Sequence, residues 1–301
     1  MLGDFCVLLG RFFSSTEGHI MSETYLSEPQ GIIKNLRLGV IGVGKMGGIV
    51  ARSIADVVFP AKHIWVTDLD STLVEQLCKE KGTSDAGDIA NLVKKTDVIF
   101  CAVPPAAVPS ILPQIAHSLS APQWLISIAA GVTTTTLEAY FQTAPPIVRV
   151  MPNISAAVGA AISVLTAGTA VNETHLEISQ EIFNACGTSL IMDERHLDAV
   201  TGVSGSGPAY VALFIEALAD AAVHVGIARA DAQKLAIHTV LGAATMLAET
   251  QEHPAVLKNR VTTPGGTTAA GLHALECGGL RATLTEAILA ATERAKELGN
   301  A

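Results

Sequence analysis

Short apolar runs alternate with helical patterns along the first two thirds of the chain. The runs cover residues 36–41, 63–67, 96–103, 124–128 and 146–151. Strands that alternate with helices in this way are typical of a doubly wound, mostly parallel sheet, so we predict an α/β fold. Two further strand-like segments, 161–166 and 188–192, flank a helix near 173–184, and we assign them to the edge of the same sheet.

After residue 193 the pattern is helical only. A Ser/Gly turn leads into the first long helix, and helices are predicted over 208–225, 229–249, from 253, over 267–275 and over 280–298. On the first of them Glu216, Asp220 and His224 form one polar stripe, and apolar residues occupy most other directions. Such a helix must be buried nearly all round. Because too few residues remain to surround it, we expect a partner subunit to cover it, with burial inside the monomer as the alternative.

The change of pattern divides the chain into three parts. We predict a dinucleotide-binding domain over residues 36–193 and an all-α dimerisation and substrate domain over 194–301. In the remaining part, residues 1–35, the apolar run Phe5–Leu9 is too short for a signal-peptide core or a membrane span. We interpret this part as a disordered extension or, because Met21 offers a second start, as a misassigned start. A transit peptide is a weaker alternative, since the segment is acidic.

The first strand leads into a glycine motif and a helix. Gly42, Gly44 and Gly47 form the pattern Gly-x-Gly-x-x-Gly. The first glycine permits the tight turn, the second lets the backbone approach a pyrophosphate, and the third lets the helix pack close to the strand. A strand before the motif and a helix after it are the context that this motif requires. We therefore predict a Rossmann-like domain that binds a dinucleotide.

In such sheets the ligand lies beyond the carboxyl ends of the strands. The predicted cofactor-binding residues are Ile41, Gly42, Val43, Gly44, Lys45, Met46, Gly47, Asp68, Ala102, Val103, Pro104, Ala129, Ala130 and Asn153. Asp68 stands where an acidic residue accepts hydrogen bonds from the adenosine ribose, and a 2′-phosphate there would meet like charge. The cofactor is therefore NADPH or NADH, and Asp68 favours NADH, unless the register places Asp70 at this position.

Composition narrows the class of partner. The net charge of −9 argues against nucleic acid or an anionic membrane, which call for a basic face. The chain has 5 cysteines, an odd number, scattered without the close pairs of a zinc or redox site. Its histidines show no metal-ligand spacing. We predict a cytoplasmic protein that binds a small molecule and no metal.

The segment Thr263-Pro264-Gly265-Gly266 predicts a type II turn, whose third residue needs a positive φ. A helix follows, and Thr267 or Thr268 is suited to cap its first turn. Free backbone N–H groups at a helix start, beside bare glycines and hydroxyls, suit a small carboxylate. An ordinary helix entry is the alternative interpretation of this segment alone.

With these residues placed, the chain resembles the pyrroline-5-carboxylate reductases over roughly residues 36–298. The likeness rests on I-G-V-G-K-M-G at 41–47, S-I-A-A-G-V-T at 127–133, R-V-M-P-N at 149–153, D-A-V-T-G-V-S-G-S-G-P-A-Y at 198–210 and L-K-N-R-V-T-T-P-G-G-T-T at 257–268. The resemblance implies NAD(P)H-dependent reduction of Δ1-pyrroline-5-carboxylate to L-proline, the final step of proline biosynthesis. It also implies a Rossmann domain followed by a helical dimerisation domain, and homodimers that often assemble into decamers.

The resemblance also implies roles for single residues. Thr268 looks like the threonine whose hydroxyl bonds the substrate ring nitrogen, and it is our catalytic candidate. Ala130 and Asn153 look like neighbours of the nicotinamide. The implied substrate-binding residues are Glu194, Thr263, Gly265, Gly266, Thr267 and Thr268.

The chain departs from the family pattern at two strand ends. The frequent Val-Lys-Pro is Val103-Pro104-Pro105 here, which removes a cation near the cofactor phosphates. The frequent Asn-Arg is Asp68-Leu69, which removes the usual contacts to a 2′-phosphate. Both departures put a preference for NADPH in doubt, and neither touches the reaction.

The residues that are missing inform the mechanism. No lysine occurs from Leu197 to Ala230, where related hydroxyacid dehydrogenases place an acid for ketone reduction. A cyclic imine carries its own basic nitrogen, so hydride delivery needs positioning more than acid catalysis. The alternatives are another imine or ketone reductase on the same scaffold and a non-catalytic dinucleotide sensor, which would not need the Thr-Pro-Gly-Gly-Thr-Thr loop.

Overall fold

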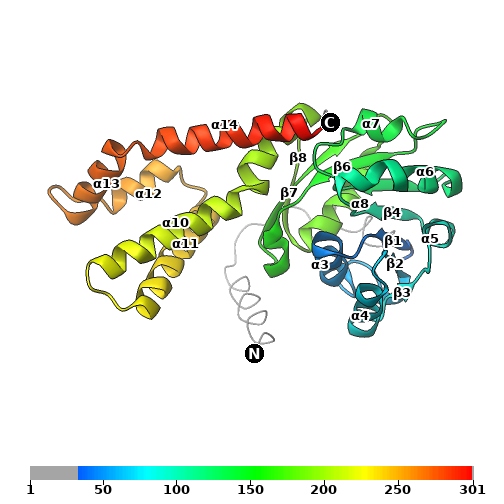
Figure 1. Cartoon of the computed structure of the whole chain (residues 1–301), viewed down its shortest axis with the longest axis horizontal. Coiled ribbons are helices and arrows are strands. Elements are labelled where there is room, and N and C mark those ends of the chain that lie inside the picture. The colour runs from blue at the N-terminus through cyan, green and yellow to red at the C-terminus, as the bar shows by residue number, and fades with distance from the viewer. Residues whose placement is uncertain (1–32, 300–301) are drawn as a thin grey trace, which may run out of the picture.

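A computed structural model describes residues 33–299 of the chain (Figure 1). The extension predicted for residues 1–35 lies outside this range except for its last three residues. Of these, Ile33 is buried against the main apolar core.

The first part of the described chain is an eight-stranded sheet with the order β3-β2-β1-β4-β5-β6-β7-β8. Neighbouring strands are parallel except β6 and β7. This topology confirms the predicted doubly wound α/β fold, with the two late segments at its edge. The strands are β1 Leu38–Ile41, β2 Ile64–Thr67, β3 Ser84–Asp85, β4 Val98–Cys101, β5 Trp124–Ser127, β6 Ile147–Met151, β7 Ala161–Ala167 and β8 Gly187–Ile191.

Helices cover both faces of the sheet because alternate strand residues point to opposite sides. Val98 and Phe100 belong to one apolar cluster, with α3 Lys45–Ile54, α4 Ser71–Lys81 and α8 Glu173–Asn184. Ile99 and Cys101 belong to the other, with α5 Ile89–Lys95, α6 Val108–Ser118 and α7 Thr134–Glu138. The central strands β1 and β4 are thus buried on both faces, and burial raises the pKa of the Cys101 thiol to about 12. Cys101 is therefore a residue of the apolar core.

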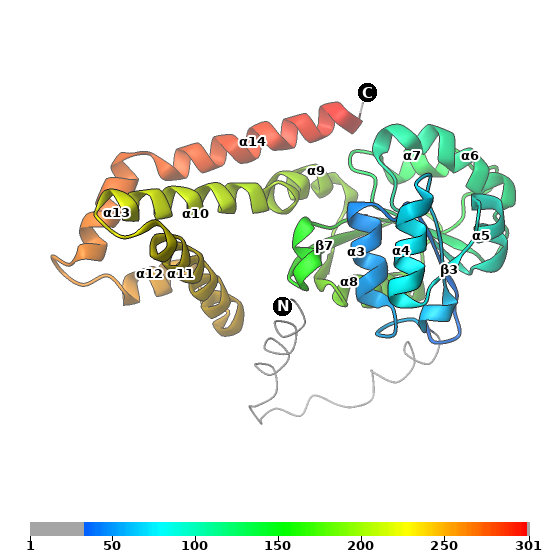
Figure 2. The same cartoon turned by 60° about the horizontal axis from the view of Figure 1, so that its bottom comes forward.

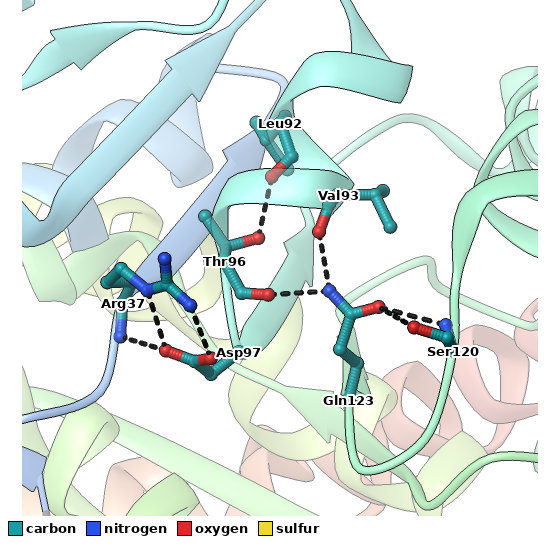
Figure 3. Close-up of polar contacts among 7 residues, drawn as sticks. All are labelled: Arg37, Leu92, Val93, Thr96, Asp97, Ser120 and Gln123. Carbon is teal, nitrogen blue, oxygen red and sulfur yellow. Dashed lines mark hydrogen bonds and ion pairs between the residues drawn. The ribbon is translucent and has the colours of Figure 1, made fainter.

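Polar contacts hold the amino ends of the central strands together (Figure 3). The Asp97 carboxylate accepts hydrogen bonds from the backbone N–H of Arg37 at 2.8 Å and from its guanidinium at 2.9 and 3.0 Å. The side-chain amide of Gln123 donates to the carbonyl of Thr96 at 2.6 Å. These contacts join the segments before β1, β4 and β5. The opposite edge, where the strands end, is left for a ligand.

The second part of the chain is a helical arm that extends away from the sheet (Figures 1 and 2). Helices α10 and α11 form a hairpin, α12 and α13 lie at the far end of the arm, and α14 returns towards the sheet. The elements are α9 Leu197–Val200, α10 Gly207–His224, α11 Arg229–Thr250, α12 Pro254–Arg260, α13 Thr267–Cys277 and α14 Leu280–Gly299. Short 3₁₀ helices are η1 Ala61–His63, η2 Pro105–Ala107, η3 Ile154–Val158 and η4 Glu194–His196.

The Ser/Gly segment before α10 is a π-helical turn, η5 Thr201–Gly205, so the prediction of a loop-like turn was wrong. The chain passes from α9 to α10 almost without a break, and the N–H of Ser206 donates to the carbonyl of Thr201 at 2.9 Å. Packing explains the small residues. A Cβ at Gly202 would lie 2.8 Å from the Thr292 hydroxyl of α14, and one at Gly205 would lie 2.6 Å from the methyl of Met151. π-Turns are frequent at functional sites.

The long helix α10 is not covered within the monomer. Leu213 is 65% exposed and Phe214 is 45% exposed, and in this helix only Ala219 is buried. The alternative of burial inside the monomer was therefore wrong. Among the described residues, 194–224 form one continuous helix that is long and apolar enough to cross a membrane by length and composition alone. A helix that a protein partner covers has the same properties.

Candidate functional site

A crevice of about 670 Å³ lies at the carboxyl ends of the strands, where the sequence predicts the cofactor. The predicted residues that line it are Ile41, Gly42, Gly44, Lys45, Met46, Asp68, Ala102, Val103, Pro104 and Ala130. Four others do not line the cavity: Val43, Gly47 and Ala129 are neighbours of lining residues, whereas Asn153 follows β6, which contributes no lining residue. The crevice has the size and position of a dinucleotide site.

The glycine turn has the geometry that its motif predicts. Gly42 has a φ of +89°, a conformation that favours glycine. A Cβ at Gly47 would lie 1.9 Å from the carbonyl oxygen of Gly42, so only glycine lets α3 approach the strand this closely. A Cβ at Gly44, by contrast, would have no neighbour within 4 Å. The protein itself does not require glycine at position 44, which fits a space kept open for a pyrophosphate at the start of α3.

Asp68 connects the glycine turn to the end of β2. Its carboxylate accepts hydrogen bonds from the backbone N–H of Val43 at 2.7 Å and of Asp70 at 3.0 Å. Asp70 instead caps α4 by accepting from the N–H of Thr72 at 2.9 Å. The register therefore places Asp68, not Asp70, against the crevice. Leu69 also lines it with a fully exposed side chain.

Sequence reasoning missed part of the crevice wall. The missed residues are Leu69, Gly87, Asp88, Ile89, Pro105, Ala107, Ile111, Gln114 and Ile128. Asp88 caps α5, and Gly87 has a φ of +77°. The sequence Asp85-Ala-Gly-Asp88 could have indicated the end of a third strand, since turn residues follow a strand there. The two-residue strand β3 was too short for its apolar pattern to be recognised.

The loop before α13 forms the predicted type II turn. The N–H of Gly266 donates to the carbonyl of Thr263 at 3.0 Å, and Gly265 has a φ of +67°. The predicted cap was wrong: Gly266 is the N-cap, and Thr267 and Thr268 are the first two residues of the helix. The turn closes on Gly266, whose extended backbone starts the helix without a side-chain bond. The first N–H groups of α13 thus remain available to an anion.

A single chain does not bring this loop to the crevice. Figures 1 and 2 show α13 at the far end of the arm from the sheet. Neither Thr267 nor Thr268 has a side-chain hydrogen bond to any residue in the range 33–299. The predicted substrate residues Thr263, Gly265, Gly266, Thr267 and Thr268 are therefore together in one turn, but apart from the predicted cofactor residues and from Glu194.

Glu194 lies at the root of the arm beside the sheet. One carboxylate oxygen accepts from the Arg149 guanidinium at 2.8 Å and from the N–H of Thr134 at 2.7 Å. The other accepts from the Thr134 hydroxyl at 2.6 Å. Burial alone would raise the pKa of Glu194, but the hydrogen bonds from Thr134 and Arg149 and the charge of Arg149 outweigh it and hold the pKa below its ordinary value. Both oxygens are thus engaged by the protein.

We expect acid to weaken this interaction. A carboxyl whose pKa is lower in the folded than in the unfolded state contributes stability above the unfolded pKa, about 4.3 for glutamate, and loses it as the pH falls through the folded pKa. Hydrogen bonds to a charged group contribute about 1.5 to 3 kcal/mol. Glu194→Gln should therefore cost about 2 kcal/mol of unfolding free energy near pH 7, and less below about pH 4.3. Urea unfolding of both proteins across this range measures the difference. A difference that is constant with pH would show that the charge of Glu194 is not involved.

Asn153 also connects the sheet to the arm. Its side-chain N–H donates to the carbonyl of Ser204 in the π-turn at 3.1 Å. The residue is 8% exposed, and its side-chain oxygen has no hydrogen-bond partner. A buried acceptor without a partner at the end of β6 fits a donor on a bound molecule, as the expectation of a nearby nicotinamide requires. Among residues 33–299 no group of three His, Cys, Asp or Glu side chains is arranged to hold a metal.

Two family models match the chain. Residues 194–298 match the model described as pyrroline-5-carboxylate reductase dimerisation, and residues 37–131 match the model of coenzyme F420-dependent NADP oxidoreductases. These matches fall on the helical arm and on the first part of the sheet.

Relatives are similar along nearly their whole length. A pyrroline-5-carboxylate reductase of Methanosarcina acetivorans is 41% identical over 269 residues, 89% of this chain and 99% of that protein. The Arabidopsis thaliana protein of the same name is 42% identical over 266 residues, 88% of this chain and 96% of that protein.

Solved structures agree with this likeness. The crystal structure of Plasmodium falciparum pyrroline carboxylate reductase with NADP bound superposes with a TM-score of 0.79, at 33% identity over 89% of this chain and 99% of that one. The Coxiella burnetii pyrroline-5-carboxylate reductase superposes with a TM-score of 0.84, at 32% identity over 87% of this chain and 98% of that one.

Proposed function

This chain belongs to the pyrroline-5-carboxylate reductase family, and from that premise we propose how its crevice and helical arm divide one reaction between them. The protein is an oxidoreductase that reduces Δ1-pyrroline-5-carboxylate to L-proline with a nicotinamide cofactor. The observation that carries the site assignment is the presence, in one chain, of a dinucleotide crevice and of a free helix start beside Thr268. The first suits the cofactor and the second suits a small imino acid.

We propose NADH as the preferred cofactor. The Asp68 carboxylate, held by the N–H of Val43, lies at the crevice, where it can accept from ribose hydroxyls and would repel a 2′-phosphate. Pro104 lines the wall where the family often has a lysine. Lys45 is the basic residue in the lining, at the first turn of α3, which suits the pyrophosphate.

A proline-forming assay with NADH and NADPH side by side tests this proposal. We expect kcat/KM with NADH to exceed that with NADPH by about tenfold or more, since about 1.4 kcal/mol of charge repulsion suffices for that factor. A preference for NADPH would contradict the role given to Asp68. No proline with either cofactor would contradict the reaction itself.

We propose that each active site is shared by two subunits. The match to a dimerisation model supports a homodimer. The exposed apolar residues of α10 suit a partner's surface better than lipid, since the family's dimerisation region spans the same helix. With the loop of α13 far from its own crevice, the loop of the partner subunit is the one that we place over the nicotinamide. Assembly of dimers into a decamer and a cytoplasmic location remain predictions.

For this reaction the protein must position the substrate against the cofactor. Bound cofactor supplies the hydride. The free N–H groups of Thr267 and Thr268 would hold the substrate carboxylate, and the Thr268 hydroxyl would hold the ring nitrogen. The substrate enters as an iminium ion, so hydride addition to its carbon yields the neutral secondary amine of proline without a further acid. This accounts for the absence of lysine between Leu197 and Ala230.

Thr268→Ala is therefore expected to lower kcat by about tenfold to a hundredfold, because the ring nitrogen loses its orienting partner. Folding should be unaffected, since the hydroxyl caps nothing in α13. Steady-state kinetics and thermal melting measure both. Thr285→Ala is the control, because that hydroxyl bonds only the carbonyl of Arg281 within its own helix. Unchanged turnover in Thr268→Ala would remove this residue from the mechanism.

A further inference from the structure

Three separate segments meet at the carboxylate of Glu194. Thr134 begins α7, directly after the loop that follows β5. Arg149 belongs to β6, where it pairs with Ser127 of β5. Glu194 itself is the first residue of η4 and of the region that matches the dimerisation model. One carboxylate thus joins the sheet to the root of the arm.

The ion pair in this junction differs from the others of the described chain. The Arg149 side chain is 5% exposed, and Glu194 provides its anionic partner at 2.8 Å. The neighbouring pair of Arg195 and Asp193 spans 3.2 Å with both side chains more than 70% exposed. A buried guanidinium is costly unless it is paired and hydrogen-bonded, so its partner is held in one place. The exposed pair imposes no such constraint.

A second contact fixes the same root. Asn153 lies two residues beyond the end of β6 and donates from its side chain to the carbonyl of Ser204 in the π-turn η5. The two contacts therefore hold the root of the arm, from η4 to η5, against β6 and the residues that follow it. The rest of the arm follows from this segment through α10, and α14 packs back on it at Gly202. A shift of the root would move the arm as a body.

We propose that Arg149 is a positioning residue for hydride transfer, acting through Glu194. The pair sets the angle at which the arm leaves the sheet, and with it the distance between the nicotinamide of one subunit and the substrate loop that the other subunit provides. This rests on the shared site of the proposed function. Glu194 then contributes to the reaction by holding the arm, because three hydrogen bonds from Arg149 and Thr134 fix its carboxylate.

The test compares Glu194→Gln, Arg149→Met and the double variant Arg149→Met/Glu194→Met in the full-length dimer. In the single variants, kcat at saturating substrates should fall by about tenfold or more, since small displacements of reacting atoms are costly. KM for pyrroline-5-carboxylate should change by less than about threefold, because the loop that binds it is intact. The dissociation constant for NADH, measured by fluorescence titration, should stay within about twofold, because the crevice lining is unchanged.

The double variant separates positioning from stability. Two apolar side chains can replace a buried ion pair without loss of stability, so its melting temperature should return towards that of the wild type. Its kcat should stay low, because the directional bonds to Thr134 are gone. Recovery of kcat together with the melting temperature would reduce the pair to a structural role and overturn the proposal.

Other outcomes are equally decisive. A large rise in KM with unchanged kcat in Glu194→Gln would make Glu194 a substrate ligand instead. Asp193→Asn is the matched control and should leave all constants unchanged, as its ion pair is exposed. A wild-type protein that makes no proline would contradict the proposed function. An active wild-type protein with fully active variants would contradict only the positioning role of Arg149 and Glu194.

Discussion

Two variants that are each strongly impaired are expected to regain activity when they form mixed dimers. Gly44→Val fills the space kept open for the pyrophosphate, and because a Cβ there meets nothing within 4 Å, the fold should tolerate it. Thr268→Ala removes the hydroxyl for the ring nitrogen. In a mixed dimer one site combines the Gly44→Val crevice with the Thr268→Ala loop and carries both defects. The other site combines the intact crevice of one chain with the intact loop of its partner.

Random pairing gives mixed dimers in half of the population, each with one working site, so activity should reach about a quarter of the wild-type value. Co-expression of the two chains with different affinity tags, followed by purification through both tags, isolates the mixed dimer for the assay. If each loop served its own crevice, the mixture would keep only the average residual activity of the two variants.

A second mixture provides the control for this experiment. One chain carries both substitutions and the other is wild type. A shared site leaves only the wild-type dimers active, about a quarter of full activity, whereas separate sites would leave about half. A shared site therefore predicts about a quarter of the wild-type activity in both mixtures. Separate sites predict only residual activity in the first mixture and about half in the second.

The second large effect concerns the choice of cofactor. Asp68→Asn with Leu69→Arg is expected to shift the ratio of kcat/KM for NADPH over NADH by about a hundredfold. The asparagine oxygen can still accept from the N–H of Val43, so the glycine turn should keep its shape. The like charge that faces a 2′-phosphate is removed, and an arginine on the fully exposed position 69 can pair with it. Together these changes are worth about 3 kcal/mol.

Single variants separate the two contributions. Leu69→Arg alone retains the carboxylate and should gain much less for NADPH. Asp70→Asn is the matched control, because Asp70 caps α4 and does not line the crevice. If Asp70→Asn shifted the preference as far as Asp68→Asn, the assignment of Asp68 to the ribose would be wrong. Steady-state kinetics with both cofactors measure the whole series.

Features that depend on neighbouring residues could be predicted from the sequence. The strands of the sheet other than β3, the glycine turn and the positive φ of Gly265 each depend on a few consecutive side chains. The cap of α13 could not, because Gly266 and Thr267 are both acceptable first residues, and the closure of the turn decides between them. The π-turn at η5 depends on packing against α14 and Met151, which no local pattern records.

The candidate site shows the same division. Ten of the crevice residues were predicted because parallel strands end at one edge of a sheet. The surroundings of Glu194 were missed, since Arg149 and Thr134 lie 45 and 60 residues away in the chain. The separation of Thr268 from the crevice could not be predicted from the sequence either, because the direction of the arm depends on tertiary contacts and not on a local pattern.

The exposed apolar surface of α10 has a consequence for how the protein behaves on dilution. A helix with Leu213 and Phe214 in water gains its stability from the partner, so folding of the arm and association of the chains are one equilibrium. Mass action then governs the integrity of the enzyme, and the midpoint of unfolding rises with protein concentration. In a cell that makes little of this chain, a smaller fraction of the chains would be associated and active.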